Sequence, residues 1–549
     1  MAYYGIDLGT SNCLVAKIVE NLDGSIDVKC LSDDEGNESF PSIIHFSGGN
    51  NYLVGESAAR KLSEYPQSTI ELVKIRLGET TLPIQIGNVS YDKSPQEISA
   101  LLLKHFNTLH NNEIDQCVLT VPAFFDQSQK DATMQAGQLA QIKINHLIEE
   151  PTAAIMYHLF SQYKARGIEW FSRDNHKNIL VFDFGGGTLD LSLIRIDYID
   201  GEVHPKVLAI GGDNKLGGNI IDFVFTKKVI QILVSQNKND SFLKKVESAY
   251  SNYYSNYINN QKLEFTPEVD GETKNYIFRL KRNLEQVKIK LSFQSKAEIV
   301  FGGIYRPILI TREQFQKTIL QDDTINIIDR ISNALYDVSS KKIPVSRVLL
   351  IGGSSQIPYI KETITEVLSE MGINESRVEL SDDFEKAVAK GAAIQSAINQ
   401  GVAVPPFMLN KCNSIVARDI EVEHAEHHST LVTMGTEYPF EKKKMIDFKI
   451  GHALSKTVNL SFYEKIQQID DIIKKKRICD VQFYLPVYYT NDKIIVSLNI
   501  NEAGLYEIEA MHDESGENIE FEPHKPNSLS KAQLLEATIS IKKMIDQDK

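Results

Sequence analysis

The stretch LVFDFGGGTLDLSLIRI, at Leu180–Ile196, decides the fold class of this chain. It is apolar at nearly every position that a sheet would bury, yet it contains Asp183, Asp190 and a glycine triplet at 185–187. Glycines have no Cβ, so backbone N–H groups can come close to a bulky anion, as phosphate binding requires. The stretch therefore predicts two strands joined by a glycine turn that faces phosphate.

A second stretch near the amino terminus repeats this design. YYGIDLGTSNCLVAKI, at Tyr3–Ile18, runs from an apolar strand to Asp7, turns at Gly9 beside Thr10, and returns as an apolar strand. Either stretch alone is equally typical of an ordinary hairpin whose glycines form a tight turn. Two copies far apart in the sequence favour two hairpins that clamp one nucleotide, in a two-lobed protein built from a duplicated domain.

The polar residues of the two hairpins suit a polyphosphate that carries a metal ion. A carboxylate cannot attract an anion directly, so we expect Asp7 and Asp183 to hold a hydrated divalent cation and to orient an attacking water. The hydroxyl groups of Thr10, Ser11 and Thr188 can donate hydrogen bonds to the terminal phosphate.

A third glycine segment, RVLLIGGSSQIPYI at Arg347–Ile360, is an apolar strand that ends at Gly352, Gly353 and Ser354. It is typical of a plain strand-to-helix turn. A bound nucleoside also needs close approach of the backbone, so the same segment is a candidate for one side of a nucleoside site.

A fourth segment, RLKRNLEQVKIKLS at Arg279–Ser292, has the pattern of an amphipathic helix. It places Glu285, Lys288 and Ser292 on one face. Taken alone, such a face is also typical of a solvated or ion-paired helix.

Composition limits the class of protein. The chain has 549 residues, 42% hydrophobic and 24% charged, so we expect several packed domains. A net charge of −14 without a long basic tract argues against a nucleic-acid partner, and the short KKKR cluster at Lys474–Arg477 is interpreted as a solvated loop or strand edge. Five scattered cysteines predict free thiols. The sequence shows no signal-peptide pattern and no apolar run of membrane-spanning length. We therefore expect a cytoplasmic protein without a membrane partner.

Six motifs together resemble, in the family's order, the DnaK-type class of seventy-kilodalton heat-shock chaperones within the actin-like ATPase superfamily. They are GIDLGTSN at Gly5–Asn12, VPAFFDQSQKDATMQAG at Val121–Gly137, EEPTAAI at Glu149–Ile155, FDFGGGTLDLS at Phe182–Ser192, GGDNKLGGNIID at Gly211–Asp222 and IGGSSQIP at Ile351–Pro358. The resemblance is strong in the first part of the chain and fainter after it.

The resemblance implies an α/β protein with a two-lobed actin-like ATPase domain, which is a duplicated ribonuclease-H-like fold, followed by a β-sandwich domain and a short C-terminal helix. The expected boundaries are 1–398 for the nucleotide-binding ATPase domain, 399–411 for the linker, 412–522 for a substrate-binding-like β-sandwich and 523–549 for a truncated lid-like helix. Short alternating apolar runs after residue 411 predict the β-sandwich independently.

The resemblance also implies a site for ATP/ADP and Mg²⁺. The implied catalytic residues are Asp7, Lys74, Glu150, Asp183 and Thr188. The implied metal residues, acting mainly through water, are Asp7, Asp183 and Asp190. The implied nucleotide contacts are Gly9, Thr10, Ser11, Asn12, Gly185, Gly186, Gly187, Thr188, Gly217, Gly218, Glu285, Lys288, Ser292, Gly352, Gly353, Ser354 and Gln356.

Lys74 depends on this context, because a single lysine is otherwise typical of a solvated surface. By resemblance it reaches the γ-phosphate and the attacking water, where a compact positive charge suits the developing oxyanion.

The chain departs from the family pattern at several positions. Gln356 stands where an arginine usually stacks on adenine, so the cationic plane is lost. Lys130 stands where an arginine usually senses the linker, and Glu149 replaces an asparagine near the catalytic centre. The apolar linker is poorly kept, since residues 401–411 supply only Phe407, Met408 and Leu409.

The segment Ser528–Gln547, with a capping signal at Ser530, supports about one helix. We therefore expect the family's long lid to be absent or minimal, and a bound peptide to leave faster.

Two functions compete. The first is an ATP-hydrolysing chaperone whose nucleotide state controls the binding of extended polypeptide segments, as a monomer served by a J-domain co-chaperone and a nucleotide-exchange factor. The alternative is a nucleotide-binding regulator or scaffold, exchange-factor-like, with little peptide-binding activity; the linker, Gln356 and the short C-terminus favour it. A filament protein or sugar kinase would share the hairpins but leave the β domain unexplained.

Overall fold

The computed structural model describes residues 2–545 except 34, 49–50, 63, 80, 88, 174–175, 259–264, 302–304, 321–325, 340–342, 382, 406–407, 409, 411, 425–426, 448–456, 470–471, 485–492, 514 and 527. The linker residues Phe407 and Leu409 lie outside the described residues. Met408 is buried.

The first sheet contains the amino-terminal hairpin. Its order is β11-β10-β1-β2-β3, with β4 paired to β2. The strands are β1 (Tyr4–Leu8), β2 (Asn12–Glu20), β3 (Ile26–Cys30), β4 (Ser39–Pro41), β10 (Gln116–Val121) and β11 (Lys143–Glu149). β1 and β2 are antiparallel, as predicted, while β10 runs parallel to β1 and to β11.

The second sheet repeats this arrangement around the opening stretch of sequence. Its order is β14-β13-β12-β17-β18, formed by β12 (His176–Phe184), β13 (Leu189–Ile199), β14 (Glu202–Asp213), β17 (Arg347–Ile351) and β18 (Val378–Leu380). β12, β13 and β14 are antiparallel, whereas β12, β17 and β18 are parallel. Each sheet thus has a three-stranded antiparallel half and a parallel half in the same order.

Two helices pack between the sheets. They are α4 (Glu150–Arg166) and α12 (Ala387–Asn399), and a single apolar cluster joins them to strands of both sheets. Their crossing is close at Gly391, where an added Cβ would lie 1.6 Å from the carbonyl oxygen of Ala153. Glu150 begins α4, so this packing fixes the position of a predicted site residue.

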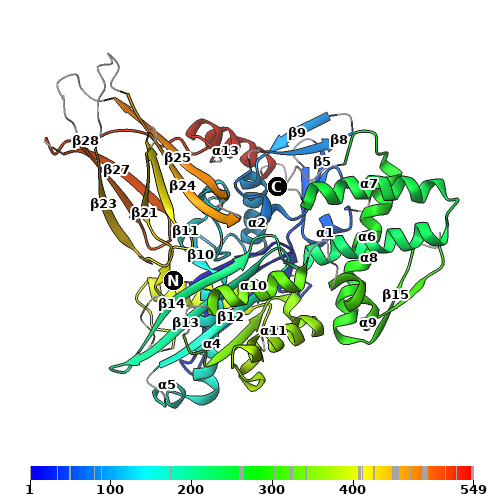
Figure 1. Ribbon diagram of the computed structural model, residues 1–549, viewed down its shortest axis with the longest axis horizontal. Coiled ribbons are helices and arrows are strands. Elements are labelled where there is room, and N and C mark those ends of the chain that lie inside the picture. Colours follow the sequence, from blue (N-terminus) through cyan, green and yellow to red (C-terminus); the bar gives the residue numbers. More distant parts are fainter. Residues whose placement is uncertain are drawn as a thin grey trace.

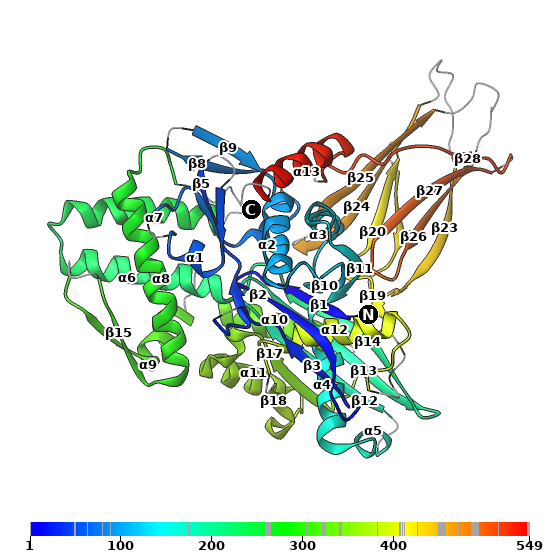
Figure 2. The same cartoon turned by 180° about the vertical axis from the view of Figure 1, so that it is seen from behind.

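The remaining elements of this part flank the sheets or, from 218 to 320, form a group at one side of the molecule (Figures 1 and 2). Beside the first sheet lie α1 (Glu56–Ala59), α2 (Pro95–Leu109), α3 (Gln127–Ala140), β5 (Ile44–Gly48), β6 (Asn51–Val54), β7 (Thr69–Ile70), β8 (Leu82–Ile86), β9 (Val89–Lys93) and a 3₁₀ turn at Val73–Arg76. Beside the second lie α5 (Glu169–Ser172), α6 (Gly218–Gln236), α7 (Ser241–Ile258), α8 (Gly271–Phe293), β15 (Lys296–Ile299), β16 (Ile308–Thr311), α9 (Arg312–Phe315), a π-helical turn at Gln316–Leu320, α10 (Ile327–Ser339), α11 (Pro358–Glu370) and 3₁₀ turns at Gly353–Gln356 and Glu375–Arg377.

The carboxy-terminal β unit, residues 414–519, contains two four-stranded sheets around one apolar core. One sheet has the order β21-β20-β24-β25, and the other β23-β26-β27-β28. The strands are β19 (Ser414–Ile415), β20 (Ile420–His424), β21 (His427–Val432), β22 (Glu437–Tyr438), β23 (Phe440–Asp447), β24 (Thr457–Ile469), β25 (Ile472–Tyr484), β26 (Lys493–Ile500), β27 (Tyr506–His512) and β28 (Asn518–Ile519). Two facing sheets with a shared core match the predicted β-sandwich.

A charged pair connects the β unit to the turn before α3, where Lys476 Nζ lies 2.5 Å from Asp126 Oδ2. Within the β unit, Lys475 Nζ lies 2.5 Å from Glu421 Oε2 on β20. Lys474–Arg477 lies in β25, the last strand of its sheet, as the strand-edge interpretation expects, and Lys475 and Lys476 are paired there with acidic side chains. Asp126 belongs to the turn that caps α3, so this contact joins the two parts of the chain.

The C-terminal helix α13 (Lys531–Ile545) begins three residues after the start of the predicted segment, whose last two residues lie outside the described part of the chain. The hydroxyl of Ser530 accepts a hydrogen bond from the backbone N–H of Gln533, as the capping signal predicts. Ala537, Ile541 and Met544 are buried in the apolar core of the first sheet. α13 therefore lies against α2 and α3 rather than on the strands of the β unit (Figures 1 and 2).

Among the helices of the described residues, none combines the length and the apolar character that crossing a bilayer requires.

Candidate active site

Both glycine hairpins end at one cleft of about 260 Å³. Of the residues predicted for catalysis, metal and nucleotide, all line this cleft except Gly217 and Asp190. Asp190 is fully buried beside Asp183, its partner across the β12–β13 pair. An added Cβ on Gly217 would lie 2.6 Å from the carbonyl oxygen of Gly186, so Gly217 supports the second hairpin from behind.

The two hairpin turns face one another at close range. An added Cβ on Gly187 would lie 2.7 Å from Thr10 Oγ1, and one on Gly186 would lie 2.2 Å from Ser11 Oγ. Larger residues would therefore push the hairpins apart. The glycines keep the backbone N–H groups of one turn beside the hydroxyls of the other, which is a suitable lining for phosphate.

One buried cation lies among the carboxylates at the floor of the cleft. Lys74 Nζ contacts Glu150 Oε1 and lies 4.0 Å from Asp7 Oδ1. Asp7 Oδ1 also accepts a hydrogen bond of 2.9 Å from Thr120 Oγ1. Burial lowers the pKa of Lys74, but Glu150 and Asp7 outweigh this effect, so the net pKa is raised and the lysine stays charged.

The carboxyl groups resist ionisation because they are buried together. Burial, followed by repulsion from Asp7 and Asp190 and offset in part by Lys74, raises the pKa of Glu150 to about 7. Burial and then the neighbouring carboxylates raise the pKa of Asp183 well above its ordinary value. A cation that entered this crowded acidic site would relieve the repulsion.

The donor set fits a hydrated Mg²⁺. Carboxylate oxygens are the ligands Mg²⁺ prefers, and Asp190 Oδ2 is buried without a hydrogen-bond partner among the described residues. In the part of the chain that the structure describes, no three His, Cys, Asp or Glu side chains converge to chelate an ion directly. This arrangement suits a metal held mainly through water and phosphate.

The other end of the cleft is formed by α8 and the third glycine segment. Lys288 Nζ donates to Asp222 Oδ2 at 2.7 Å and to the carbonyl of Gly218 at 3.2 Å. Ser354 Oγ donates to the carbonyl of Gly185 at 2.8 Å. Burial raises the pKa of Asp222 to about 6, and Lys288 offsets part of this effect.

Two apolar residues of this end were missed by the sequence interpretation. Ile289 and Phe293 line the cleft from α8, and their exposed fractions are 45% and 68%. They follow Glu285 by four and eight residues, so a continued helix face would have identified them. Their exposed side chains suit the flat face of a base.

Glu149 and Lys130, the charged departures from the family pattern, both contact one residue of the β unit. The carboxylate of Glu149 accepts a hydrogen bond from the Tyr438 hydroxyl, and Lys130 Nζ lies 5.7 Å from the centre of the Tyr438 ring. Gln356, in contrast, is half-buried in the cleft lining.

Comparison with known proteins covers nearly the whole chain. The family model described as Hsp70 protein matches residues 3–253 and 249–549. The chaperone protein DnaK of Metamycoplasma hominis is 29% identical over 546 residues, which are 96% of this chain and 80% of that relative. The similarity therefore includes the cleft, the β unit and α13.

Proposed function

This chain belongs to the Hsp70 family and is an ATP-dependent chaperone with ATPase activity, and from that premise we propose how its parts carry out the reaction. The two sheets with equal strand order are the two lobes of a duplicated ribonuclease-H-like, actin-like ATPase domain at 1–398. Residues 399–411 are the linker, 412–522 the peptide-binding β-sandwich, and 523–549 a shortened lid-like segment.

The phosphates of ATP lie between the two hairpin turns. Thr10, Ser11 and the backbone of the glycine triplet at 185–187 donate hydrogen bonds to them. Asp7, Asp183 and Asp190 hold the water shell of Mg²⁺. When bound, the ion neutralises phosphate charge and polarises the γ-phosphate.

The base and ribose lie at the α8 end of the cleft. Glu285, Lys288 and Ser292 contact them from one side, and Gly352, Gly353, Ser354 and Gln356 from the other. Gly218 closes the site near the phosphates. The cleft lining of both sides supports this placement.

Hydrolysis depends on the buried Lys74–Glu150 pair, the observation that carries the proposal. Lys74 donates to the terminal phosphate as negative charge develops there, while Glu150 and Asp7 hold its ammonium in place. Thr188, together with Asp7 and Asp183, orients the attacking water. Because these groups are already positioned by α4 and the two hairpins, little rearrangement is needed during the reaction.

The partners follow from the chaperone function. We propose extended polypeptide segments as clients of the β-sandwich, a J-domain co-chaperone and a nucleotide-exchange factor as regulators, and a monomer in the cytoplasm. Similarity along the whole chain favours this chaperone over the regulator or scaffold.

One experiment tests coupling between the two halves. Release of a fluorescent extended peptide is measured with ADP and then with ATP, and phosphate release is followed in the same sample. We expect ATP to speed peptide release while phosphate appears slowly. Peptide that is never held, or is held equally with either nucleotide, would contradict the proposed coupling.

A further inference from the structure

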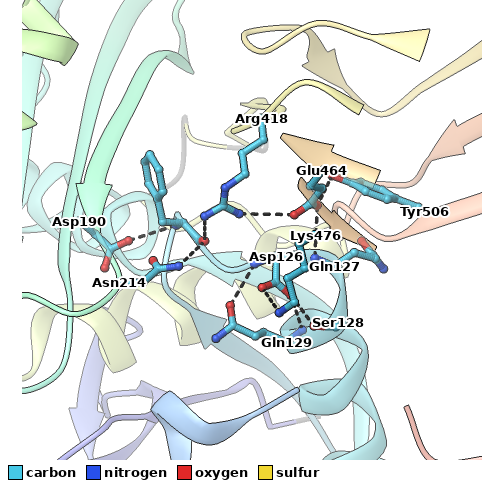
Figure 3. A network of polar contacts seen from close by, with 11 residues as sticks. Asp126, Gln127, Ser128, Gln129, Asp190, Asn214, Arg418, Glu464, Lys476 and Tyr506 are labelled. Atoms are coloured by element: carbon cyan, nitrogen blue, oxygen red, sulfur yellow. Dashed lines mark hydrogen bonds and ion pairs between the residues drawn. The ribbon is translucent and has the colours of Figure 1, made fainter. Parts of the chain in front are cut away.

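Phe124 is hydrogen-bonded both to Asp190 of the second sheet and to Arg418 of the β unit, which Figure 3 labels. Its backbone N–H donates to Asp190 Oδ1 at 3.2 Å. Its carbonyl oxygen accepts from Asn214 Nδ2 at 3.1 Å and from Arg418 Nη2 at 2.7 Å. Two backbone groups of one residue therefore connect the buried carboxylate beside Asp183 with a side chain of the β unit.

Arg418 is held firmly in this place. It is buried, and its guanidinium carbon lies 5.1 Å from the centre of the Phe124 ring. Its Nη1 lies 3.5 Å from Oε2 of the buried Glu464. Glu464 Oε1 also accepts from the Tyr506 hydroxyl at 3.0 Å and from the backbone N–H of Gln127 at 3.3 Å.

The buried pair depends on the ATPase domain. A buried ion pair overcomes the cost of losing water only when further hydrogen bonds satisfy both charges. Here the Phe124 carbonyl and the Gln127 N–H supply two of those bonds, and both belong to the turn before α3. Arg418 and Glu464 thus gain these two hydrogen bonds only when the β unit lies against this turn.

The orientation of Asp190 depends on the same turn. Burial raises the pKa of Asp190, and hydrogen bonds from Thr188 and from the backbone N–H groups of Phe124 and Ala123 oppose this effect. The N–H groups of Ala123 and Phe124 immediately precede the Phe124 carbonyl that Arg418 holds. A shift of that carbonyl would move both donors away from the carboxylate.

We propose that Arg418 is a positioning residue for the nucleotide cleft: by holding the Phe124 carbonyl, it fixes the Ala123–Phe124 N–H groups on Asp190. This inference rests on the proposed role of Asp190 beside the hydrated metal. Arg418 acts from the β unit through Phe124 and does not touch the nucleotide.

Other contacts between the two parts offer a control. Lys525 Nζ lies 2.7 Å from Asp131 Oδ2, on α3, away from the turn that holds Asp190. Lys525→Met removes an ion pair between α3 and the segment that follows the β unit, without touching Phe124. It therefore reports what weaker docking alone does.

The test uses the full chain with Arg418→Met, Arg418→Lys and Lys525→Met. The first readout is hydrogen exchange of the 122–126 amides without nucleotide, and the second is the Mg²⁺ concentration for half-maximal ADP binding. Arg418→Met should speed exchange and raise that Mg²⁺ concentration, each by up to about tenfold, as expected for loss of one charged hydrogen bond. Arg418→Lys should stay close to the wild type in the exchange rate and in the Mg²⁺ concentration, because a lysine retains one charged donor. Lys525→Met should change neither of these two quantities.

Arg418→Met leaves Glu464 buried without its cation, so the variant can fail to fold. The double variant Arg418→Met with Glu464→Gln leaves no unpaired charge and should show the same two shifts. Equal shifts in Lys525→Met, or no shift in the double variant, would overturn the proposal. Wild-type ADP binding that did not depend on Mg²⁺ would instead contradict the proposed function. The two failures can be told apart, because the exchange readout tests Arg418 without any nucleotide.

Discussion

The ammonium of Lys74 contacts Glu150 Oε1 and lies 4.0 Å from Asp7 Oδ1, so one buried cation is shared between a carboxylate of α4 and a carboxylate of β1. Lys74 thus connects α4, the helix between the sheets, to the amino-terminal hairpin. The cation is therefore placed where both hairpin turns meet the terminal phosphate in the proposed reaction.

Lys74→Ala should lower ATP hydrolysis by about 10²- to 10³-fold, the usual effect of losing one preorganised donor in an active site. The affinity for ADP should change little, because Lys74 is proposed to act at the terminal phosphate. Single-turnover phosphate release and ADP titration measure the two effects. Lys104→Ala, at a half-buried position of α2 away from the cleft, is the control. Unchanged turnover at saturating ATP would contradict the catalytic assignment.

Binding of Mg²⁺ with ADP should release protons at pH 7. The pKa of Glu150 is about 7 without ligand, so about half of the molecules carry its proton at this pH. A nearby divalent cation lowers the pKa of a carboxyl group, so binding expels the proton and affinity rises with pH. Calorimetry in two buffers with different ionisation enthalpies measures the release.

The share of the release that comes from Glu150 should fall towards zero near pH 9, where this group is already ionised. Glu150→Gln should remove its share at pH 7. Proton uptake on binding, or release that does not change in Glu150→Gln, would show that Glu150 is not the group that titrates.

The hairpins and most of the cleft could be predicted because their signal is local. Each depends on an aspartate, glycines and hydroxyl residues within about one turn, a pattern that reads directly from the sequence.

The contacts between distant segments could not be predicted in this way. Arg418, Lys476 and Tyr438 contact residues about 290 to 350 positions away in the sequence. Nothing in the neighbourhood of each residue specifies these partners. The place of α13 was missed for the same reason, since its buried face, with Ala537 and Ile541, would suit any apolar surface.

Gln356→Arg should tighten ADP binding by about two- to fivefold, the gain expected from one cation–π contact at a partly exposed site. Gln356 is half-buried in the cleft lining, so a longer planar side chain can reach the base. Gln356→Lys provides the matched control, because it adds the same charge without the plane. Equal tightening in both variants would attribute the gain to charge rather than to stacking.

Gly391→Ala should destabilise the protein by about 3 kcal/mol, at the upper end of the effect of overpacking. Its Cβ would lie 1.6 Å from the Ala153 carbonyl oxygen and 2.4 Å from its carbon, and this backbone cannot move without separating α12 from α4. Gly271→Ala, with nothing within 4 Å of the added Cβ, should stay within about 0.5 kcal/mol of the wild type. Denaturant unfolding measures both. Because Glu150 begins α4, Gly391→Ala should also slow hydrolysis at temperatures where the chain is still folded. Normal stability in this variant would mean that α4 and α12 do not cross this closely.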